Sequence, residues 1–179
     1  MKIFKAQGLL AVIILSAAIV GCGVQGKPES NLGSTAAPTA SSAPEPTPVL
    51  NTKEAIIYLT DAELNETVEQ PVKLTYETDA DLVKAAIAEL QKDAGENALS
   101  LWKPIEVKTV ELADGLVTID IHLPDEARLG APGEMFVIET LKSTLFQFDF
   151  VKSIELLVDG AEIETLMGHV ELEHPMNKE

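Results

Sequence analysis

The chain has 179 residues, enough for one ordinary domain with appended segments but not for two full-sized domains. Its 13 Lys and Arg residues face 29 Asp and Glu residues, and this acidic balance disfavours nucleic acid and anionic lipid surfaces as partners. The single cysteine, Cys22, excludes an internal disulfide, a cysteine zinc site and a dithiol redox pair.

The first 21 residues have the layout of a secretory signal peptide. Two lysines, Lys2 and Lys5, precede an apolar run over residues 8–20. A membrane-spanning helix needs about 20 apolar residues, whereas the apolar core of a signal peptide has roughly 7–15. The run therefore predicts export, with residues 1–21 removed as a lipoprotein signal peptide.

The residues Ile19-Val20-Gly21-Cys22 resemble the bacterial lipobox, in which an aliphatic, a permissive and a small residue precede the cysteine. The resemblance implies transfer of a diacylglyceryl group to the Cys22 sulfur, followed by cleavage before Cys22. Two lipid chains hold a protein stably on a membrane, because each buried methylene contributes about 0.8 kcal/mol. The alternative is an uncleaved N-terminal anchor in which the cysteine is incidental.

Residues 22–52 are predicted to be a disordered linker that begins at the lipidated cysteine. They are rich in Pro, Ser, Thr, Ala and Gly and poor in large apolar side chains, so they cannot form a core. As a flexible coil, about thirty such residues reach roughly 30 Å. Loss of Lys2 and Lys5 with the signal leaves 11 bases against 29 acids, and a protein this acidic is expected to stay off anionic lipid.

The folded domain is expected over residues 53–172. Residues 55–61 begin with alternating and β-branched side chains, which predicts a strand. Residues 71–77 predict a second extended piece. Thr78 has the character of a helix N-cap, and Asp79 and Asp81 suit the positive end of the helix dipole. A helix with one apolar face follows, and Gly95 is its expected stop, the apolar residues being Leu82, Val83, Ala86, Ile87 and Leu90.

The second half of the domain predicts a hairpin, a helix and a final strand. Residues 105–112 and 116–121 flank Asp114-Gly115, a strong hairpin signal. Pro132 opens a helix, and residues 151–160 form a strand that ends in a second Asp-Gly turn. This pattern predicts an α+β two-layer sandwich, a small mixed β-sheet with two helices on one face in the order βαββαβ. Residues 173–179 are expected to be a flexible tail.

Metal-ligand spacings occur at two places. Asp120 and His122 lie two apart on one strand face, which suits either a pair of metal ligands or a solvated polar face. His169 and His174 occur among the acids Glu171 and Glu173, where the choice is between metal binding and a polar tail. We predict no metal site at either place.

No catalytic constellation is predicted. Carboxylate pairs such as Glu111 with Asp120, or Asp125 with Glu126, carry little information in so acidic a chain. The serines lack a nucleophile elbow, and no glycine loop suits a phosphate. Trp102 either anchors a partner or packs onto the apolar core of its own domain, and we favour the second interpretation. We predict that the protein is not an enzyme and that it has no catalytic residue, no cofactor-binding residue and no cofactor. Cys22 is the one modification site that we predict.

The residues from 103 to 172 resemble the GerM domain family of sporulation and spore germination. The shared features are the Asp114-Gly115 turn, the strand over residues 117–120, the Thr144-Leu145 pair with Phe148, and the strand over residues 151–160. Residues 53–90 fit the family's opening strand and first helix more loosely. The resemblance implies a non-enzymatic extracytoplasmic module, similar in fold to ring-building motifs, in lipoproteins of Gram-positive spore-forming bacteria.

Together these features predict a lipoprotein on the outer face of the cytoplasmic membrane. Its partners are expected to be the membrane, through Cys22, and an unidentified envelope or sporulation-complex protein, with no nucleic acid. The alternative is a lipoprotein that binds a small molecule or a divalent cation for a membrane partner. An acidic surface would favour the cation, and calcium titration by calorimetry separates the two hypotheses.

Overall fold

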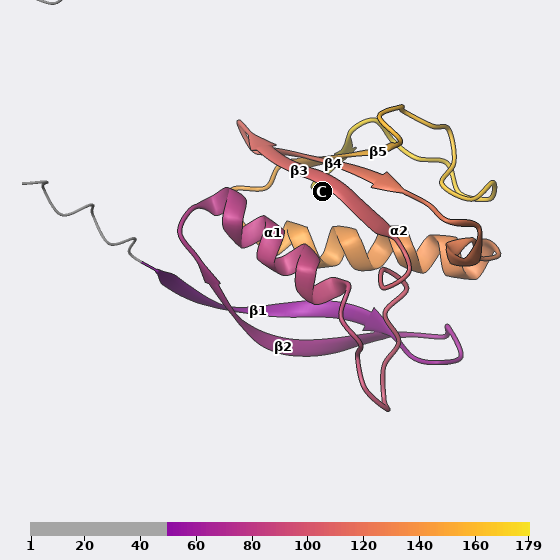
Figure 1. The fold of residues 1–179 in the computed structure, drawn as a ribbon, viewed down its shortest axis with the longest axis horizontal. Helices are drawn as coiled ribbons and strands as arrows, with labels where there is room; N and C mark the ends of the chain where they lie inside the picture. The colour runs from indigo at the N-terminus through magenta and orange to yellow at the C-terminus, as the bar shows by residue number, and fades with distance from the viewer. Residues whose placement is uncertain (1–49) are drawn as a thin grey trace, which may run out of the picture. The chain divides into compact units, whose positions relative to one another are not determined.

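The computed structural model describes residues 50–179, so the predicted signal peptide, Cys22 and nearly all of the predicted linker lie outside the described residues. The described chain forms a domain of two sheets and two α-helices (Figure 1). The elements are β1 (Asn51–Thr60), β2 (Thr67–Tyr76), α1 (Asp79–Leu90), β3 (Glu106–Ala113), β4 (Leu116–His122), a short 3₁₀ helix (Asp125–Ala127), α2 (Ala131–Phe146), β5 (Ser153–Val158) and β6 (Met176–Asn177).

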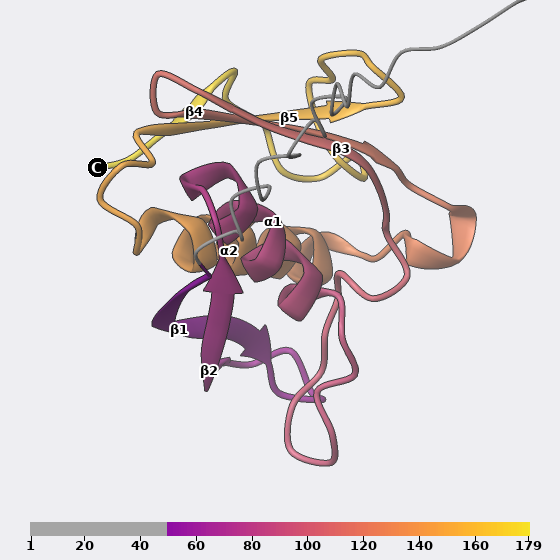
Figure 2. The ribbon, with the colours of Figure 1, turned by 60° about the vertical axis from the view of Figure 1, so that its left-hand side comes forward.

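The two helices lie between the two sheets. β3, β4, β5 and β6 form a mixed sheet in that order, in which β4 and β5 are parallel and the other pairs antiparallel. Figures 1 and 2 show α1 and α2 on one face of this sheet and the β1–β2 hairpin beyond them. The predicted α+β class, with both helices on one face of a mixed sheet, is confirmed. The hairpin adds a further layer, because β1 and β2 form a sheet of their own and do not join the larger sheet.

Side chains at the C-terminal end of α2, from Thr144 and the C-cap residue Gln147, pair with part of the outer edge of β1. The Gln147 amide accepts a hydrogen bond from Ile56 N at 2.9 Å and donates one to Ile56 O at 2.7 Å, as a neighbouring strand would. The Thr144 hydroxyl accepts from Tyr58 N at 3.1 Å, and Thr60 pairs with Leu99 through both backbone groups. These contacts satisfy both backbone groups of Ile56 and Thr60, and the Tyr58 nitrogen, without another strand.

Helix α1 begins as the sequence predicts. Thr78 accepts a hydrogen bond from Asp81 N, and Asp81 accepts one from Thr78 N, which makes a capping box. The predicted apolar face is buried, as Leu82, Val83, Ala86, Ile87 and Leu90 all show. The helix ends at Leu90, ahead of Gly95, which lies in the following loop.

Both Asp-Gly turns form as predicted. Asp114 and Asp159 have φ of 53°, and the glycines that follow them also have positive φ.

The Trp102 side chain is fully buried, and its Nε1 donates to Val137 O at 2.9 Å, so Trp102 belongs to the core. Phe148, which follows the Thr144-Leu145 pair, lies just beyond the end of α2 and is buried there.

The C-terminal segment differs from the predicted flexible tail. Within residues 173–179, Met176 and Asn177 form β6, which pairs with Ile154 and Ser153 of β5. Met176 is buried, and burial of its apolar side chain explains why the segment packs on the sheet.

Among residues 50–179, no helix is both long enough and apolar enough to cross a membrane.

Candidate functional site

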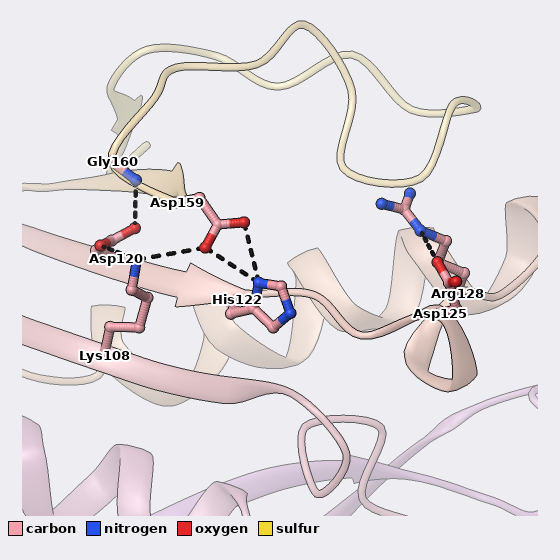
Figure 3. Close-up of polar contacts among 7 residues, drawn as sticks. All are labelled: Lys108, Asp120, His122, Asp125, Arg128, Asp159 and Gly160. Carbon is pink, nitrogen blue, oxygen red and sulfur yellow. Dashed lines mark hydrogen bonds and ion pairs between the residues drawn. The ribbon is translucent and has the colours of Figure 1, made fainter. Parts of the chain in front are cut away.

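A polar cluster lies on the outer face of the large sheet, away from the helices. It consists of Lys108 in β3, Asp120 and His122 in β4, and Asp159 after β5 (Figure 3). β4 alternates, so Val117, Ile119 and Ile121 enter the core while Asp120 and His122 face outward, as the sequence predicts. An irregularity in the β3–β4 register falls at Lys108, between Val107 and Thr109.

Lys108 lies between the two aspartates of this cluster. Its Nζ is 3.4 Å from Asp120 Oδ2 and 3.3 Å from Asp159 Oδ1. His122 Nδ1 lies 3.0 Å from both Asp159 oxygens, and Gly160 N donates to Asp120 Oδ1 at 2.8 Å. The two carboxylates raise the pKa of Lys108, Asp159 contributing most.

The hydrogen bond from His122 is the main cause that lowers the Asp159 pKa; burial opposes it and Lys108 adds to it. The cluster is therefore a chain of ion pairs with its own cation. Asp120 and His122 are linked only indirectly, through Lys108 and Asp159. Within residues 50–179, no three His, Cys, Asp or Glu side chains are arranged so that they could hold a metal ion. Asp125 is separate from the cluster and pairs with Arg128 at 3.6 Å.

The two C-terminal histidines bind different elements. His169 Nδ1 lies 2.9 Å from Glu134 Oε2 in the first turn of α2, whereas His174 Nδ1 binds Glu155 of β5. A hollow of about 620 Å³ beside His174 is lined by Glu162, Glu164 and Glu171 among other residues.

Glu134 fixes the loop that carries His169. Its carboxylate is fully buried and accepts hydrogen bonds from Met167 N at 2.7 Å and His169 N at 2.9 Å, besides the His169 ring. Burial raises the pKa of Glu134, but the hydrogen bonds from Met167, His169 and Val170 outweigh burial and leave the pKa below its ordinary value. The carboxylate is thus an ionised anchor for the loop.

Sequence reasoning missed Glu134, Glu155 and Gln147 as organising residues. Each contacts a segment far along the chain, and none lies in a recognisable motif. The available signal was weak: Glu134 follows Pro132 in a first helical turn, where an acid is expected for local reasons alone.

A groove of about 540 Å³ runs between α2 and the C-terminal residues. Met135, Ile138, Phe146 and Val170 line its apolar part. The Met135 side chain is 48% exposed, unusual for a large apolar residue in this domain. The lining residues supply apolar contact area and no hydrogen-bonded acid–base pair.

A family model described as sporulation and spore germination matches residues 56–164. The chain belongs to this family, named Germane. No curated protein sequence matches the chain significantly. The family match confirms the resemblance found in the sequence.

Solved structures show the same Germane fold. The tandem GerMN domains of the sporulation protein GerM from Bacillus subtilis match with a TM-score of 0.53 and 16% identity, over 71% of this chain and 46% of that one. The first GerMN domain of the same protein matches with a TM-score of 0.51 and 17% identity, over 70% of this chain and 98% of that one. The described Germane domain thus corresponds to one domain of the tandem.

A Clostridium perfringens protein described as a candidate lipoprotein matches with a TM-score of 0.49 and 20% identity, over 72% of this chain and 88% of that one.

Proposed function

We propose that the protein is a lipoprotein held by Cys22 on the outer face of the cytoplasmic membrane, where its Germane domain binds another protein of a sporulation, germination or envelope complex. The domain acts by binding and not as an enzyme. The observation that carries the sporulation role is the family match over residues 56–164.

The polar groups of the described domain support a binding role. Asp120, His122 and Asp159 are engaged with Lys108 and Gly160, and Glu134 is engaged by the loop that it anchors. A catalytic acid or base needs a proton-transfer partner in a substrate cleft. These side chains instead hold neighbouring elements together.

The lipobox over residues 19–22 supports the anchor, and Cys22→Ala tests it. We expect the variant to accumulate as an unprocessed precursor that takes up no labelled fatty acid, because lipid transfer needs the thiol. Gly23→Ala, one residue past the lipobox, is the matched control and should mature normally. Normal maturation and lipid labelling of Cys22→Ala would refute the anchor.

Deletion of the gene tests the role in sporulation. We expect fewer heat-resistant spores or slower germination, restored by the wild-type gene and poorly by Cys22→Ala, because a released domain loses its place at the membrane. Wild-type spore yield and germination in the deletion strain would remove the sporulation role. Cross-linking in living cells would then identify the envelope protein that the domain contacts.

A further inference from the structure

His174 differs from the other two histidines of the chain in how its ring is bound. Its Nδ1 faces a carboxylate oxygen of Glu155, and its Nε2 lies 2.8 Å from the carbonyl oxygen of Ile163. Both partners are acceptors, so both ring nitrogens must carry a proton to make both hydrogen bonds. For His122 and His169 the structure records side-chain partners through Nδ1 alone, which a neutral ring can satisfy.

The segment joined at His174 is also held elsewhere: Glu134 of α2 accepts from Met167 N and His169 N, and Ala161 exchanges two backbone hydrogen bonds with Val158 at the end of β5. Glu155 belongs to β5, Ile163 to the segment after the second Asp-Gly turn, and His174 itself precedes β6. The segment closes on itself through Leu172 N, which donates to Glu164 O at 2.9 Å. It closes on the sheet through the two residue pairs of β6 and through Lys178 N, which donates to Lys152 O at 2.9 Å.

We propose that His174 is a proton-dependent clasp: when its ring is doubly protonated it holds residues 161–178 against β5, and when it loses a proton it loosens that segment. A neutral ring can donate to Glu155 or to Ile163 but not to both. One of the two contacts would then place a ring lone pair against an oxygen lone pair, which is repulsive.

The charges that face His174 are negative on every side. Glu155 reaches it from β5, and Glu162, Glu164 and Glu171 line the hollow beside it; Glu173 precedes it in the chain. Among the described residues that line this hollow, no lysine or arginine occurs. The His174 side chain is 19% exposed and Glu155 is 14% exposed, so solvent screens the pair only in part.

The pKa of His174 agrees with this geometry. The hydrogen bond to Glu155 raises it most, the Ile163 carbonyl raises it further, and burial opposes both. A histidine whose folded pKa lies above its unfolded value of 6.5 stabilises the folded form fully below pH 6.5, and this stabilisation is lost as pH rises through the folded pKa. The clasp is therefore closed in mildly acidic solution and loosens toward alkaline pH.

Loosening would uncover a defined part of the domain. Leu172 and Met176 of the segment are buried against the rest of the domain, and β6 covers the edge of β5 at Ser153 and Ile154. An uncovered strand edge offers unpaired backbone groups to another chain. The inference concerns the domain alone, so its failure would leave the proposed membrane anchor and sporulation role untouched.

Amide hydrogen exchange, followed by nuclear magnetic resonance between about pH 6 and about pH 9, tests the clasp. The readouts are the amides of Leu172 and Lys178, with Ile119 in β4 as the measure of global stability. After correction for intrinsic exchange, we expect protection of the first two to fall with rising pH, up to tenfold for each unit by which the folded pKa exceeds 6.5. Protection at Ile119 should change much less.

Three variants separate the clasp from other titrations. His174→Gln should show low protection at Leu172 and Lys178 at every pH. Glu155→Gln should move the midpoint to lower pH, and His122→Gln, the matched control, should keep the wild-type profile. Constant protection in the wild type, or an unchanged pH profile in His174→Gln, would overturn the proposal. If His174→Gln does not fold, titration of the wild-type His174 ring decides: a pKa at or below 6.5 overturns the proposal.

Discussion

Replacement of Glu134 by glutamine should destabilise the domain although the two side chains have the same shape. The Glu134 carboxylate accepts from Met167 N, His169 N and the His169 ring, and it is fully buried. Glutamine keeps one acceptor oxygen and turns an NH₂ group toward the remaining donors. Glu134→Gln therefore loses at least one hydrogen bond and sets donors against each other.

The expected size of this effect follows from the contacts. A hydrogen bond to a charged group contributes about 1.5–3 kcal/mol, and a buried donor without an acceptor costs about 1–3 kcal/mol. We expect Glu134→Gln to lower the free energy of unfolding by about 2–4 kcal/mol at pH 7. For a domain of this size the melting temperature should fall by roughly 6–12 °C.

The dependence on pH gives this prediction a second, independent check. The folded pKa of Glu134 is below its ordinary value of 4.5, so its stabilising effect is complete above pH 4.5 and is lost as pH falls through the folded pKa. The difference between wild type and Glu134→Gln should therefore be constant near neutral pH and shrink in acid. Urea denaturation at several pH values measures it.

A control on the same helix makes the comparison specific. Glu139 is exposed, so Glu139→Gln removes the same charge from α2 without breaking a buried contact. We expect a change within about 0.5 kcal/mol for this variant. The reasoning would be refuted if Glu134→Gln unfolded at the same urea concentration as the wild type, or if Glu139→Gln were equally destabilised.

Two further predictions concern the β1 edge and the two Asp-Gly turns. Gln147→Ala removes both hydrogen bonds to Ile56 and should cost about 2 kcal/mol in urea denaturation; sedimentation should also show more self-association because the edge is opened, and an unchanged sedimentation profile would contradict this. Gly115→Ala places a Cβ 2.9 Å from Phe150 O, whereas Gly160→Ala meets nothing within 4 Å. Both glycines have positive φ, so Gly115→Ala should lower the melting temperature more than Gly160→Ala, and equal losses would show that backbone strain alone matters.

The features that were predictable from sequence are those set by neighbouring residues. The capping box at Thr78 and Asp81 lies within one helical turn, and the turn at Asp114 is fixed by its own backbone preference. The apolar spacing along α1 identified its buried face for the same reason, since a helix brings residues three and four apart together. Such signals hold whatever the rest of the fold does.

The partition of strands into two sheets was not predictable from local patterns. Buried and less buried side chains alternate along both β1 and β5, and nothing in either segment indicates which strand it will pair with. β2 was predicted to begin at Pro71, yet it begins at Thr67 and Pro71 lies inside it. The strand can include Pro71 because this residue lies opposite Ile56, at a position whose nitrogen faces away from β1. A proline is tolerated at such an outer edge since no ladder hydrogen bond is lost.

The same limit applies to the candidate site. Gln147 and Ile56 are 91 residues apart, and Glu134 and His169 are 35 apart, so each pairing exists only after the chain has folded. Asp120 and His122 were recognised as neighbours on one strand face, but the partners that define their chemistry, Lys108 and Asp159, come from two other segments. Spacing on one strand therefore left a metal pair and a solvated polar face as alternatives, and it could not show that the fold supplies a lysine.

Family membership accounts for only part of the C-terminal architecture. The family match ends at residue 164, whereas Leu166, Leu172 and Met176 lie beyond it and are buried in the same core. The anchored loop at His169 and the contacts of His174 also lie beyond the match. Because these contacts connect α2 and β5 to the end of the chain, any property that they confer, including a response to pH, must be tested on this chain and cannot be transferred from the family.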